Sequence, residues 1–400
     1  MPKKSIRQLD LTGRRLFIRV DFNVPIRNGV IGDDTRIRAA LPTLSHALDR
    51  GATVIIGSHL GRPEGTANPA FSLRPIGNRL TELLDRPVVF SPEVTGPRAA
   101  NAVTEAAPGG VVLLENLRFH PGEEANDGKF AAALAALADC YVNDAFGVAH
   151  RAHASTVGIV QHLSDAAAGL LMASELAHLG ALLESPPRPF VAVLGGAKVS
   201  GKLEVIENLL SRIDTLLIGG AMAYTFFKSH GLQVGRSLVE DALIDTIGAI
   251  EQDAATRGVQ LELPTDHVVT DKLEPGGTHA TIDVRDPSIG QRFGVDIGPR
   301  TSARYGTTLA KARTVVWNGP MGIFEIDSFA AGTVSIAKAV AASRATSIVG
   351  GGDSVAAIGR AGVTDGITHI STGGGASLEF LGGRRLPGID VLPDAAELRS

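Results

Sequence analysis

The sequence predicts an α/β protein built on parallel sheets, and three observations support this. Short apolar runs typical of buried strands alternate with amphipathic segments typical of helices. The 400 residues include 47 glycines, which suits many tight turns between strands and helices. Several apolar runs end in polar or glycine-rich segments, and ligands of parallel sheets bind beyond the carboxyl ends of the strands. A chain of this length predicts two domains or one large α/β unit.

Five apolar runs in the first half are predicted strands: 15–20, 52–57, 87–90, 110–114 and 140–142. Predicted helices lie between them at 35–50, 73–84 and 129–138. The Ala/Leu-rich segment 165–183 predicts a further helix, which the proline-rich residues 184–189 end. Such a break at mid-chain indicates a domain boundary, although an ordinary crossover helix within one sheet is the alternative.

The segments after four of these strands carry arginine or histidine. The residues of interest there are Asp21, Asn23, Arg36, His59, Arg62, Arg118, His150, Arg151 and His153. Any one cation alone could be a solvated arginine or a capping histidine, but their recurrence at strand ends predicts a site for a small, multiply charged anion. Asp21 and Asn23 would orient the cations or bind substrate hydroxyls. His150 and His153 have metal-ligand spacing, but no cysteine or acidic cluster completes a zinc site, so we interpret them as hydrogen-bonding or structural residues.

Residues 189–202 (Pro-Phe-Val-Ala-Val-Leu-Gly-Gly-Ala-Lys-Val-Ser-Gly-Lys) predict a buried strand followed by a polyphosphate site. Lys198 and Lys202 would share one face of a first turn if Lys198 opens a helix. The segment also matches G-x-x-x-x-G-K, but Leu203 stands where a P-loop needs a hydroxyl for magnesium. The alternative is a glycine-rich turn with two solvated lysines.

The second half repeats the alternation, with predicted strands at 190–194, 216–218, 314–316, 346–349 and 369–371. The segments after these strands are rich in glycine and nearly free of arginine, which suits close approach of a nucleotide to backbone amides. Asp353, after three glycines, is the predicted carboxylate for a phosphate-bound Mg²⁺, whereas Ser354 could cap the next helix. One half thus predicts an anion site and the other a nucleotide site, and phosphoryl transfer joins the two.

Composition narrows the class of protein further. The net charge of −4 gives no reason to expect nucleic acid or an acidic membrane as a partner. The single cysteine, Cys140, fits a reducing compartment, and we predict that its thiol is buried in a strand. No apolar run approaches the ~18 residues of a membrane span, and the N-terminus has no signal-peptide pattern. We therefore expect a cytoplasmic protein.

Seven motifs in order resemble the phosphoglycerate kinase family over essentially the whole chain. They are Arg-Val-Asp-Phe-Asn-Val-Pro, Ser-His-Leu-Gly-Arg-Pro, Leu-Glu-Asn-Leu-Arg-Phe, Gly-Gly-Ala-Lys-Val-Ser-Gly-Lys, Trp-Asn-Gly-Pro-Met-Gly-Ile-Phe-Glu, Gly-Gly-Gly-Asp-Ser and Ser-Thr-Gly-Gly-Gly-Ala-Ser. The resemblance implies two Rossmann-like lobes, each a parallel sheet flanked by helices, joined by a helix hinge. The implied domains are a phosphoglycerate-binding lobe 1–164, a hinge 165–188, a nucleotide-binding lobe 189–380 and a C-terminal segment 381–400 that returns to the first lobe.

The resemblance also implies site residues. For 3-phosphoglycerate they are Asp21, Asn23, Arg36, His59, Arg62, Arg118 and Arg151. For the nucleotide they are Lys198, Lys202, Gly219, Gly220, Gly294, Asn318, Glu325, Gly350, Gly351, Gly352, Asp353 and Ser354, with Mg²⁺ on Asp353. Arg36, Lys198, Gly373 and Gly374 would surround the phosphoryl group in transit. Ser354 stands where threonine is common, and residues 382–385 depart from the usual acidic residue and lysine, which bears on how the tail docks.

The implied reaction is reversible, Mg²⁺-dependent transfer between ATP and the carboxylate of 3-phosphoglycerate, giving ADP and 1,3-bisphosphoglycerate after lobe closure. A carboxylate acceptor is already ionised at neutral pH, so no general base is needed. A monomer is the family expectation. A P-loop ATPase is disfavoured by Leu203, and a dinucleotide oxidoreductase by the absence of G-x-G-x-x-G after the first strand. A non-catalytic binding protein would have lost some of these cations, and none is missing.

Overall fold

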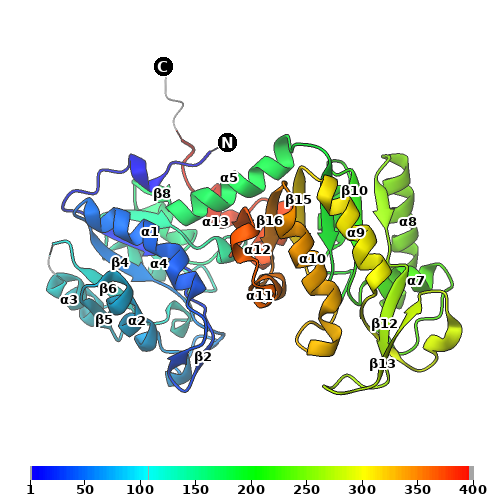
Figure 1. Cartoon of the computed structure of the whole chain (residues 1–400). Helices are drawn as coiled ribbons and strands as arrows, with labels where there is room; N and C mark the ends of the chain where they lie inside the picture. The colour runs from blue at the N-terminus through cyan, green and yellow to red at the C-terminus, as the bar shows by residue number, and fades with distance from the viewer. Residues whose placement is uncertain (1, 107, 396–400) are drawn as a thin grey trace. The chain divides into compact units, whose positions relative to one another are not determined.

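The computed structural model describes residues 2–106 and 108–395 (Figure 1). The chain divides into two compact units. The first comprises the chain up to Ala177 together with the segment that begins at Arg385, and the second spans His178–Arg384. Residues 396–400 of the predicted C-terminal segment lie outside the described part of the chain. Within the described residues, no helix is both long and apolar enough to cross a membrane.

The first unit is built on a six-stranded parallel sheet with the strand order β5-β6-β4-β1-β7-β8. These strands are β1 (Arg15–Arg19), β4 (Thr53–Gly57), β5 (Val88–Ser91), β6 (Val111–Leu114), β7 (Cys140–Asn143) and β8 (Ala166–Ala168). The strands are nearly all buried because helices cover both faces, which is why the sequence reads as continuous apolar runs. Its helices are α1 (Thr35–Asp49), α2 (Arg74–Leu84), α3 (Pro97–Glu105) and α4 (Gly128–Ala135). A two-stranded hairpin, β2 (Ile26–Arg27) and β3 (Val30–Ile31), precedes α1.

Alternation along the strands decides which side chains meet α1 and α2. Leu16 and Ile18 of β1 share one face of the sheet, since successive side chains point to opposite faces. They pack in one apolar cluster with Ile37 and Leu44 of α1 and with Leu80 of α2. This cluster fixes the carboxyl ends of β1 and β4 relative to α1, so the polar residues that follow these strands are held on a rigid base.

The second unit has a six-stranded parallel sheet in the order β11-β10-β9-β15-β16-β17. These strands are β9 (Phe190–Leu194), β10 (Thr215–Ile218), β11 (Gln260–Glu262), β15 (Thr314–Asn318), β16 (Thr346–Gly350) and β17 (His369–Ile370). In chain order this is the 3-2-1-4-5-6 arrangement of Rossmann folds, whose order reverses between β9 and β15. The predicted fold class, two Rossmann-like α/β units with parallel sheets, is confirmed.

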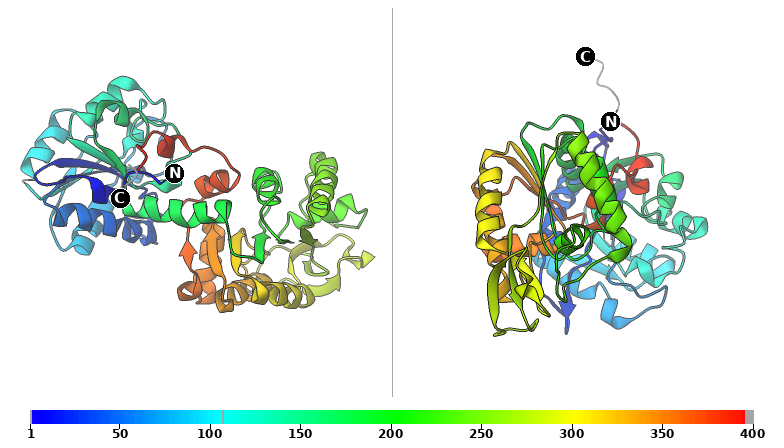
Figure 2. Two further views of the ribbon diagram at one scale, coloured as in Figure 1. Left: turned by 90° about the horizontal axis from the view of Figure 1, so that it is seen from above. Right: turned by 90° about the vertical axis from the view of Figure 1, so that its right-hand side faces the viewer.

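Helices cover both faces of the second sheet. They are α6 (Leu203–Leu209), α7 (Ala223–Ser229), α8 (Ile244–Thr256), α9 (Pro299–Lys311), α10 (Ala331–Ala342), α11 (Gly352–Ala361) and α12 (Gly375–Leu381). Figure 2 shows α8 on one side of the strands and α9 and α10 on the other. The latter face contains the buried indole of Trp317, packed in one cluster with Tyr305 of α9 and Ile336 of α10.

A three-stranded antiparallel sheet in the second unit was not predicted from the sequence. It consists of β12 (Asp266–Thr270), β13 (His279–Asp283) and β14 (Phe293–Ile297) in the order β13-β12-β14. β13 is largely exposed, so it lacks the apolar run by which the other strands were recognised. The β14 strand carries Gly294, one of the predicted nucleotide residues, to the wall of the cavity described below.

The predicted helix 165–183 is partly wrong. Residues Ala166–Ala168 form β8, which pairs in parallel with Tyr141–Asn143 of β7, and the helix α5 runs from Leu170 to Glu184. Alanine favours a helix, but the backbone of β7 has an edge that needs hydrogen-bond partners, and residues 166–168 supply them. Pairing in the tertiary structure therefore outweighed the local helix propensity. The α5 helix begins in the first unit and continues into the second.

The segment from Arg385 packs within the first unit. This segment contains the short helix α13 (Pro387–Asp390). The Gly388 amide of α13 donates a hydrogen bond to the Ala149 carbonyl at 2.9 Å. The Asn143 amide group in turn donates to the Gly388 carbonyl at 2.9 Å. Lys3 forms an ion pair with Asp394 at 2.8 Å. The first unit therefore contains residues from both ends of the sequence.

Candidate active site

The loop after β1 begins the candidate anion site of the first unit. Asp21 accepts a hydrogen bond from Arg36 Nη1 at 3.0 Å, and the same nitrogen donates to the Asn23 carbonyl at 3.3 Å. His59 Nδ1 lies 3.9 Å from the other Asp21 oxygen. Arg36 reaches this loop because it lies in the first turn of α1, which packs beside β1 and β4. Four of the predicted residues, from three separate segments, are thus brought together.

The loop after β4 connects this group to Arg118. The Gly61 amide donates to Asn23 Oδ1 at 3.0 Å, and the Gly61 carbonyl accepts from Arg118 Nη1 at 2.8 Å. Gly61 has a positive φ of 62°, which explains the glycine here. Burial lowers the pKa of Arg118, and the charges of Arg19 and Arg151 act in the same direction while Glu124 opposes them. A buried guanidinium surrounded by other cations is a strong attractor for an anion.

Two predicted cations lie at the exposed edge of this group. Arg62 follows Gly61 and is exposed. Arg151 is also exposed, and its Nε lies 3.3 Å from His150 Nε2. His153 is buried instead, and burial lowers its pKa to about 3, with the nearby arginines acting the same way. His153 is therefore neutral at physiological pH.

Four buried residues beneath this site were not predicted from the sequence: Arg19, Asn116, Glu123 and Ser155. Asn116 holds the loop after β4 by accepting from the Leu60 amide at 3.2 Å and donating to the Leu60 carbonyl at 2.7 Å. Arg19 offered a usable signal, since it is a charged residue that directly follows the apolar residues Leu16, Phe17 and Ile18 of a predicted strand. Glu123 and Ser155 carried none, because their importance depends on contacts with residues far away in the sequence.

In the second unit, the loops after β9 and β15 meet where the strand order reverses. The Gly195 amide donates to the Asn318 carbonyl at 3.0 Å, and the Gly196 amide donates to the Pro320 carbonyl at 2.9 Å. Gly319 has a positive φ of 94°, and a Cβ there would lie 2.2 Å from the Gly195 carbonyl oxygen. The bare backbone expected from the sequence is therefore required for these two loops to approach each other.

Lys202 and Asn318 form the polar part of this site. Lys202 Nζ donates to Asn318 Oδ1, and Asn318 Nδ2 donates to the Gly350 carbonyl at 2.8 Å. Burial lowers the pKa of Lys202 to about 8, while the carboxylate of Asp353 acts in the opposite direction. An incoming phosphate would favour the charged form of this lysine.

The conditional prediction that Lys198 opens a helix is wrong. α6 begins at Leu203, with Lys202 as the residue before its first turn. Lys198 lies instead in the turn after β9, next to the buried Val199, and is exposed. Gly196, with a φ of 100°, bends the chain before a helix can start. The two lysines consequently come from a turn and a helix boundary, not from one helical face.

The loop after β16 is Gly351, which leads into α11, and the segment after β17 passes through Ser371 and Thr372 to two glycines before α12. Asp353 lies in the first turn of α11 and is exposed. The idea that Ser354 caps α11 is wrong, because its buried hydroxyl accepts from the Gly319 amide at 2.6 Å and so ties α11 to the loop after β15. Gly374 has a positive φ of 52° and precedes α12, while the Gly373 amide donates to Ser371 Oγ at 3.2 Å.

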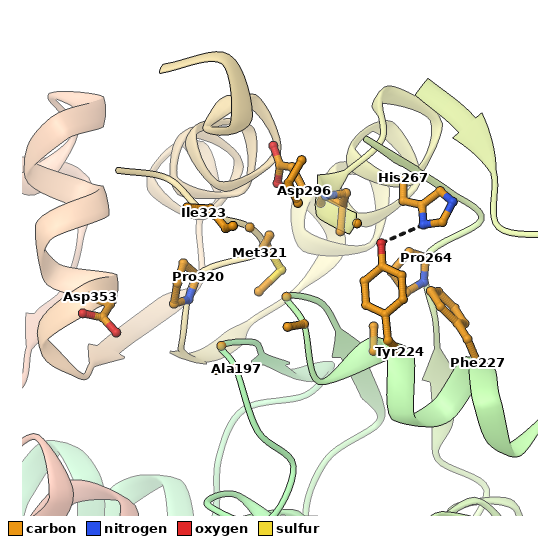
Figure 3. A pocket seen from close by; sticks show the side chains of 18 of the residues that line it. Ala197, Tyr224, Phe227, Pro264, His267, Asp296, Pro320, Met321, Ile323 and Asp353 are labelled. Atoms are coloured by element: carbon orange, nitrogen blue, oxygen red, sulfur yellow. Dashed lines mark hydrogen bonds between the residues drawn. The ribbon is translucent and has the colours of Figure 1, made fainter. Parts of the chain in front are cut away.

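A cavity of about 270 Å³ lies beside the loops after β9 and β15 (Figure 3). Four predicted nucleotide residues line it: Gly220, Gly294, Glu325 and Asp353. Figure 3 shows Tyr224, Phe227 and His267 on one side and Pro320 and Asp353 on the opposite side. Gly219 closes against Met321, since a Cβ at Gly219 would lie 2.4 Å from the Met321 sulfur. The size and apolar lining suit a planar heterocyclic base.

The aromatic wall of the cavity was also missed by the sequence analysis. Tyr224 Oη lies 2.7 Å from His267 Nδ1, and Phe227 packs edge-on against the tyrosine ring. Burial lowers the pKa of His267 to about 4, so this histidine is neutral. Gly294 faces Tyr224 so closely that a Cβ there would lie 1.5 Å from Tyr224 Oη. Tyr224 and His267 belong to segments in which the sequence shows no functional motif.

Asp296 is the remaining titratable group of the cavity wall. Its two oxygens accept from the amides of Ile297 at 2.9 Å and Gly332 at 2.6 Å. Burial raises the pKa of Asp296 to about 7. Because both oxygens accept backbone amides, this carboxyl holds the start of α10 against β14.

The strand order of the second sheet, its base-sized cavity and the cation-rich strand ends of the first sheet define the class as an α/β phosphotransferase. The family model described as phosphoglycerate kinase matches residues 6–384. The chain belongs to the phosphoglycerate kinase family.

Individual relatives agree with this assignment. The phosphoglycerate kinase of Solibacter usitatus is 56% identical over 393 residues, which cover 97% of this chain and 98% of that protein. The phosphoglycerate kinase of Koribacter versatilis is 53% identical over 400 residues, covering 98% and 99%. Among solved structures, phosphoglycerate kinase from Coxiella burnetii matches with a TM-score of 0.86 and 43% identity over 98% of both chains. The enzyme from Pyrococcus horikoshii matches with a TM-score of 0.86 and 37% identity.

Proposed function

We propose that this chain catalyses reversible phosphoryl transfer between MgATP and the carboxylate of 3-phosphoglycerate, giving ADP and 1,3-bisphosphoglycerate. The observation that carries the proposal is the different chemistry of the two sets of strand ends. The first sheet gathers Arg36, His59 and Arg118, whereas the second offers bare backbone, Lys202 and a base-sized cavity. An acidic substrate suits the first set and a nucleotide suits the second.

For 3-phosphoglycerate, we assign binding to Asp21, Asn23, Arg36, His59, Arg62, Arg118 and Arg151. Arginine forks bind carboxylate and phosphate oxygens in pairs, while Asp21 and Asn23 offer acceptors for a hydroxyl. Support comes from the linked hydrogen bonds of Arg36, Asp21, Asn23 and Gly61. Arg62 and Arg151 are exposed, so their side chains can turn toward a bound anion.

For the nucleotide, we assign the base to the cavity beside Gly219, Gly220, Gly294 and Glu325, with Tyr224 and Phe227 as its aromatic wall. The phosphates would meet Lys198, Lys202, Asn318 and the 350–354 segment. Ser354 acts through its bond to the Gly319 amide. Backbone amides at the starts of α11 and α12 favour negative charge.

Asp353 is our candidate for Mg²⁺ bound with the nucleotide. It is an exposed carboxylate at the edge of the cavity, and its charge acts on Lys202. Mg²⁺ commonly takes one or two protein carboxylates together with substrate phosphates, so the donor set fits. When bound, the ion supplies neutralisation of phosphate charge during transfer.

The reaction requires positioning and charge neutralisation by the chain's own residues. The acceptor is a carboxylate, which is ionised at neutral pH, so no side chain has to remove a proton. Arg36, Lys198 and the amides of Gly373 and Gly374 would neutralise the phosphoryl group in transit. We propose the first unit as the phosphoglycerate lobe, the second as the nucleotide lobe and α5 as part of the hinge. Direct in-line transfer then requires the two lobes to close. A cytoplasmic monomer is the state that we propose.

A trapping assay tests the proposed reaction. The purified chain is incubated with MgATP, 3-phosphoglycerate and hydroxylamine, which captures an acyl phosphate, while ADP is followed. We expect ADP formation that depends on 3-phosphoglycerate, together with the trapped acyl product. ADP release without 3-phosphoglycerate would instead indicate an ATPase, and binding of both ligands without turnover would indicate a non-catalytic protein.

A further inference from the structure

A charged side chain lies fully buried beneath the candidate anion site. Arg19, at the end of β1, has 0% exposure, as have Glu123 and Ser155, and His59 has 2%. These four residues come from four separate segments, and only His59 was expected to bind substrate. A buried guanidinium is costly unless its N–H groups are paired, so its partners show what holds it there.

The direction of each hydrogen bond on one side of Arg19 is unambiguous. Arginine can only donate, so Arg19 Nε donates to Ser155 Oγ at 2.7 Å. The Ser155 hydroxyl proton is then directed to Glu123 Oε1 at 2.5 Å. The Ser155 amide donates to Glu123 Oε2 at 3.0 Å. Both oxygens of Glu123 thus act as acceptors from Ser155, and Oε1 lies 4.0 Å from Arg19 Nη2.

The other side of Arg19 faces a histidine. Arg19 Nη2 lies 3.4 Å from His59 Nδ1. Because the guanidinium has no acceptor, Nδ1 must accept this hydrogen bond and carries no proton. The ring proton of His59 therefore lies on Nε2.

The charges around His59 agree with a neutral ring. The groups that face it are Arg19 of β1, Asp21 of the next loop, Arg36 of α1, Arg118 of the segment after β6 and His153. Burial lowers the pKa of His59 well below its ordinary value, and Arg19, Arg118, Arg36 and His153 act in the same direction. The carboxylate of Asp21, at 3.9 Å, is too distant for a hydrogen bond to Nδ1.

We propose that Glu123 is a positioning residue which, through Ser155, orients Arg19 so that Arg19 holds His59 as its Nε2–H tautomer in the phosphoglycerate site. His59 then offers the anion a hydrogen-bond donor with a fixed direction, and the arginines supply the charge. The identity of the anion rests on the proposed function, whereas the tautomer of His59 does not.

Histidine NMR of the full chain tests the tautomer directly. The chain is labelled with ¹⁵N-histidine, and the His59 signals are assigned by their loss in His59→Gln. We expect one-bond coupling of a proton to Nε2, an unprotonated Nδ1, and no titration around the ordinary histidine pKa of 6.5. A proton on Nδ1, or a normal titration, would overturn the proposal.

Two variants test the positioning role. Ser155→Ala removes the hydroxyl between Arg19 and Glu123, and Glu123→Gln replaces the acceptor with an amide that also carries donors. Either change should raise the KM for 3-phosphoglycerate roughly tenfold or more, which corresponds to one lost charge-assisted hydrogen bond. The KM for MgATP and kcat should change little, because binding lost equally in the ground and transition states affects KM alone. In both variants the His59 signals should show loss of the single tautomer.

Ser91→Ala is the matched control, since Ser91 is a fully buried serine of the same unit whose hydroxyl donates to the Glu93 carbonyl at 2.6 Å and accepts from the Glu93 amide at 3.3 Å. Ser91→Ala should lose about as much stability as Ser155→Ala, without a change in the KM for 3-phosphoglycerate or in the His59 signals. If Glu123→Gln does not fold, Ser155→Ala still decides the matter. Variants with wild-type KM and wild-type His59 spectra would refute the role of Glu123. Absence of any phosphoglycerate-dependent turnover in the wild type would instead refute the proposed function and leave the tautomer test valid.

Discussion

At the scale of single side chains, the two units present positive charge in different ways. Arg36 is half-buried and hydrogen-bonded to Asp21, so its direction is set before any ligand binds. Lys198 is exposed on a turn, so it can follow a phosphate that moves. A planar guanidinium with a fixed direction suits a small carboxylate or phosphate ligand, whereas a flexible ammonium group suits a phosphoryl group that is being transferred.

We expect Arg36→Ala and Lys198→Ala each to lower kcat by roughly 10³-fold, as for other cations that stabilise phosphoryl transfer. The physical reason is the loss of charge neutralisation in the transition state. Steady-state kinetics of the forward and reverse reactions measure the effect. Lys338→Ala, at an exposed position of α10, is the control and should behave as wild type. Near-normal turnover in either site variant would reject the role assigned to it.

Gly294 is a position where a single added carbon atom should disturb the proposed nucleotide site. We expect Gly294→Ala to displace Tyr224, because the new Cβ would lie 1.5 Å from Tyr224 Oη, and to raise the KM for MgATP at least tenfold. Overpacking of this kind typically costs about 1–3 kcal/mol of stability. Kinetics and thermal unfolding together measure both effects.

The control for this change is Gly248→Ala. Gly248 lies in α8 with nothing within 4 Å of an added Cβ, so alanine there should be neutral or slightly stabilising. An unchanged KM for MgATP in Gly294→Ala would show that Tyr224 can move without cost and that the aromatic wall is not part of the nucleotide site.

At the scale of elements, local sequence predicted ten of the twelve strands in the two parallel sheets within one or two residues, because a strand buried on both faces must be apolar throughout; it missed β8 and the edge strand β11. It failed where tertiary pairing competed with propensity, as at β8, whose three alanines pair with β7. It also failed where a strand is exposed, as at β13. For the site, it located the strand ends that carry charge or glycine, but not Arg19, Tyr224 or His267, whose roles depend on distant partners.

The start of α5 gives a pH-dependent prediction. Asp144 is fully buried, and its Oδ1 accepts from the Met172 amide at 3.0 Å. Burial raises the pKa of Asp144 from 3.8 to about 6. Between these values the folded state keeps a proton that the unfolded state has released, so the free energy of unfolding falls as the pH rises through this window. The slope is about 1.4 kcal/mol per pH unit.

Asp144→Asn keeps an acceptor oxygen for Met172 but cannot titrate. We therefore compare the free energies of unfolding of the variant and of wild type. As the pH rises from the unfolded to the folded pKa of Asp144, the variant should gain about 3 kcal/mol relative to wild type. Urea unfolding of both proteins on either side of this window measures the difference. A difference that stays constant with pH would show that Asp144 does not titrate there.

At the scale of the whole molecule, the first unit depends on residues from the end of the chain. Leu386, Ile389 and Leu392 are buried, and Gly388 exchanges hydrogen bonds with Ala149 and Asn143. Each buried aliphatic side chain contributes about 1.5–3 kcal/mol. A chain that ends at Arg384 should therefore unfold at clearly lower urea concentration, with the loss confined to probes in the first unit.

Arg385→Ala is the control for this truncation, because the Arg385 side chain is exposed and pairs with Asp390 at 2.9 Å at the surface. Exposed pairs contribute about 0–1 kcal/mol, so this variant should match wild type. Equal stability of the truncated chain and wild type would mean that the segment from Arg385 is not needed for the fold of the first unit.

Lobe closure is the prediction that concerns both units together. If phosphoglycerate and nucleotide bind to different units, transfer between them requires approach, and small-angle scattering should show compaction with both ligands but less with either alone. A nonhydrolysable ATP analogue prevents turnover during the measurement. No compaction with both ligands would contradict direct transfer by closure.

The sequence by itself determined the α/β class, the strand ends that carry cations in one half and the strand ends that carry glycines in the other, because these depend on local patterns of apolar, charged and glycine residues. Only the tertiary structure decided that Arg19 is bound between Glu123 and His59, that Gly294 faces Tyr224, and that Lys198 lies outside the α6 helix. The physical reason is that hydrogen bonds and close packing join residues far apart in the chain, and local sequence patterns carry no record of such contacts.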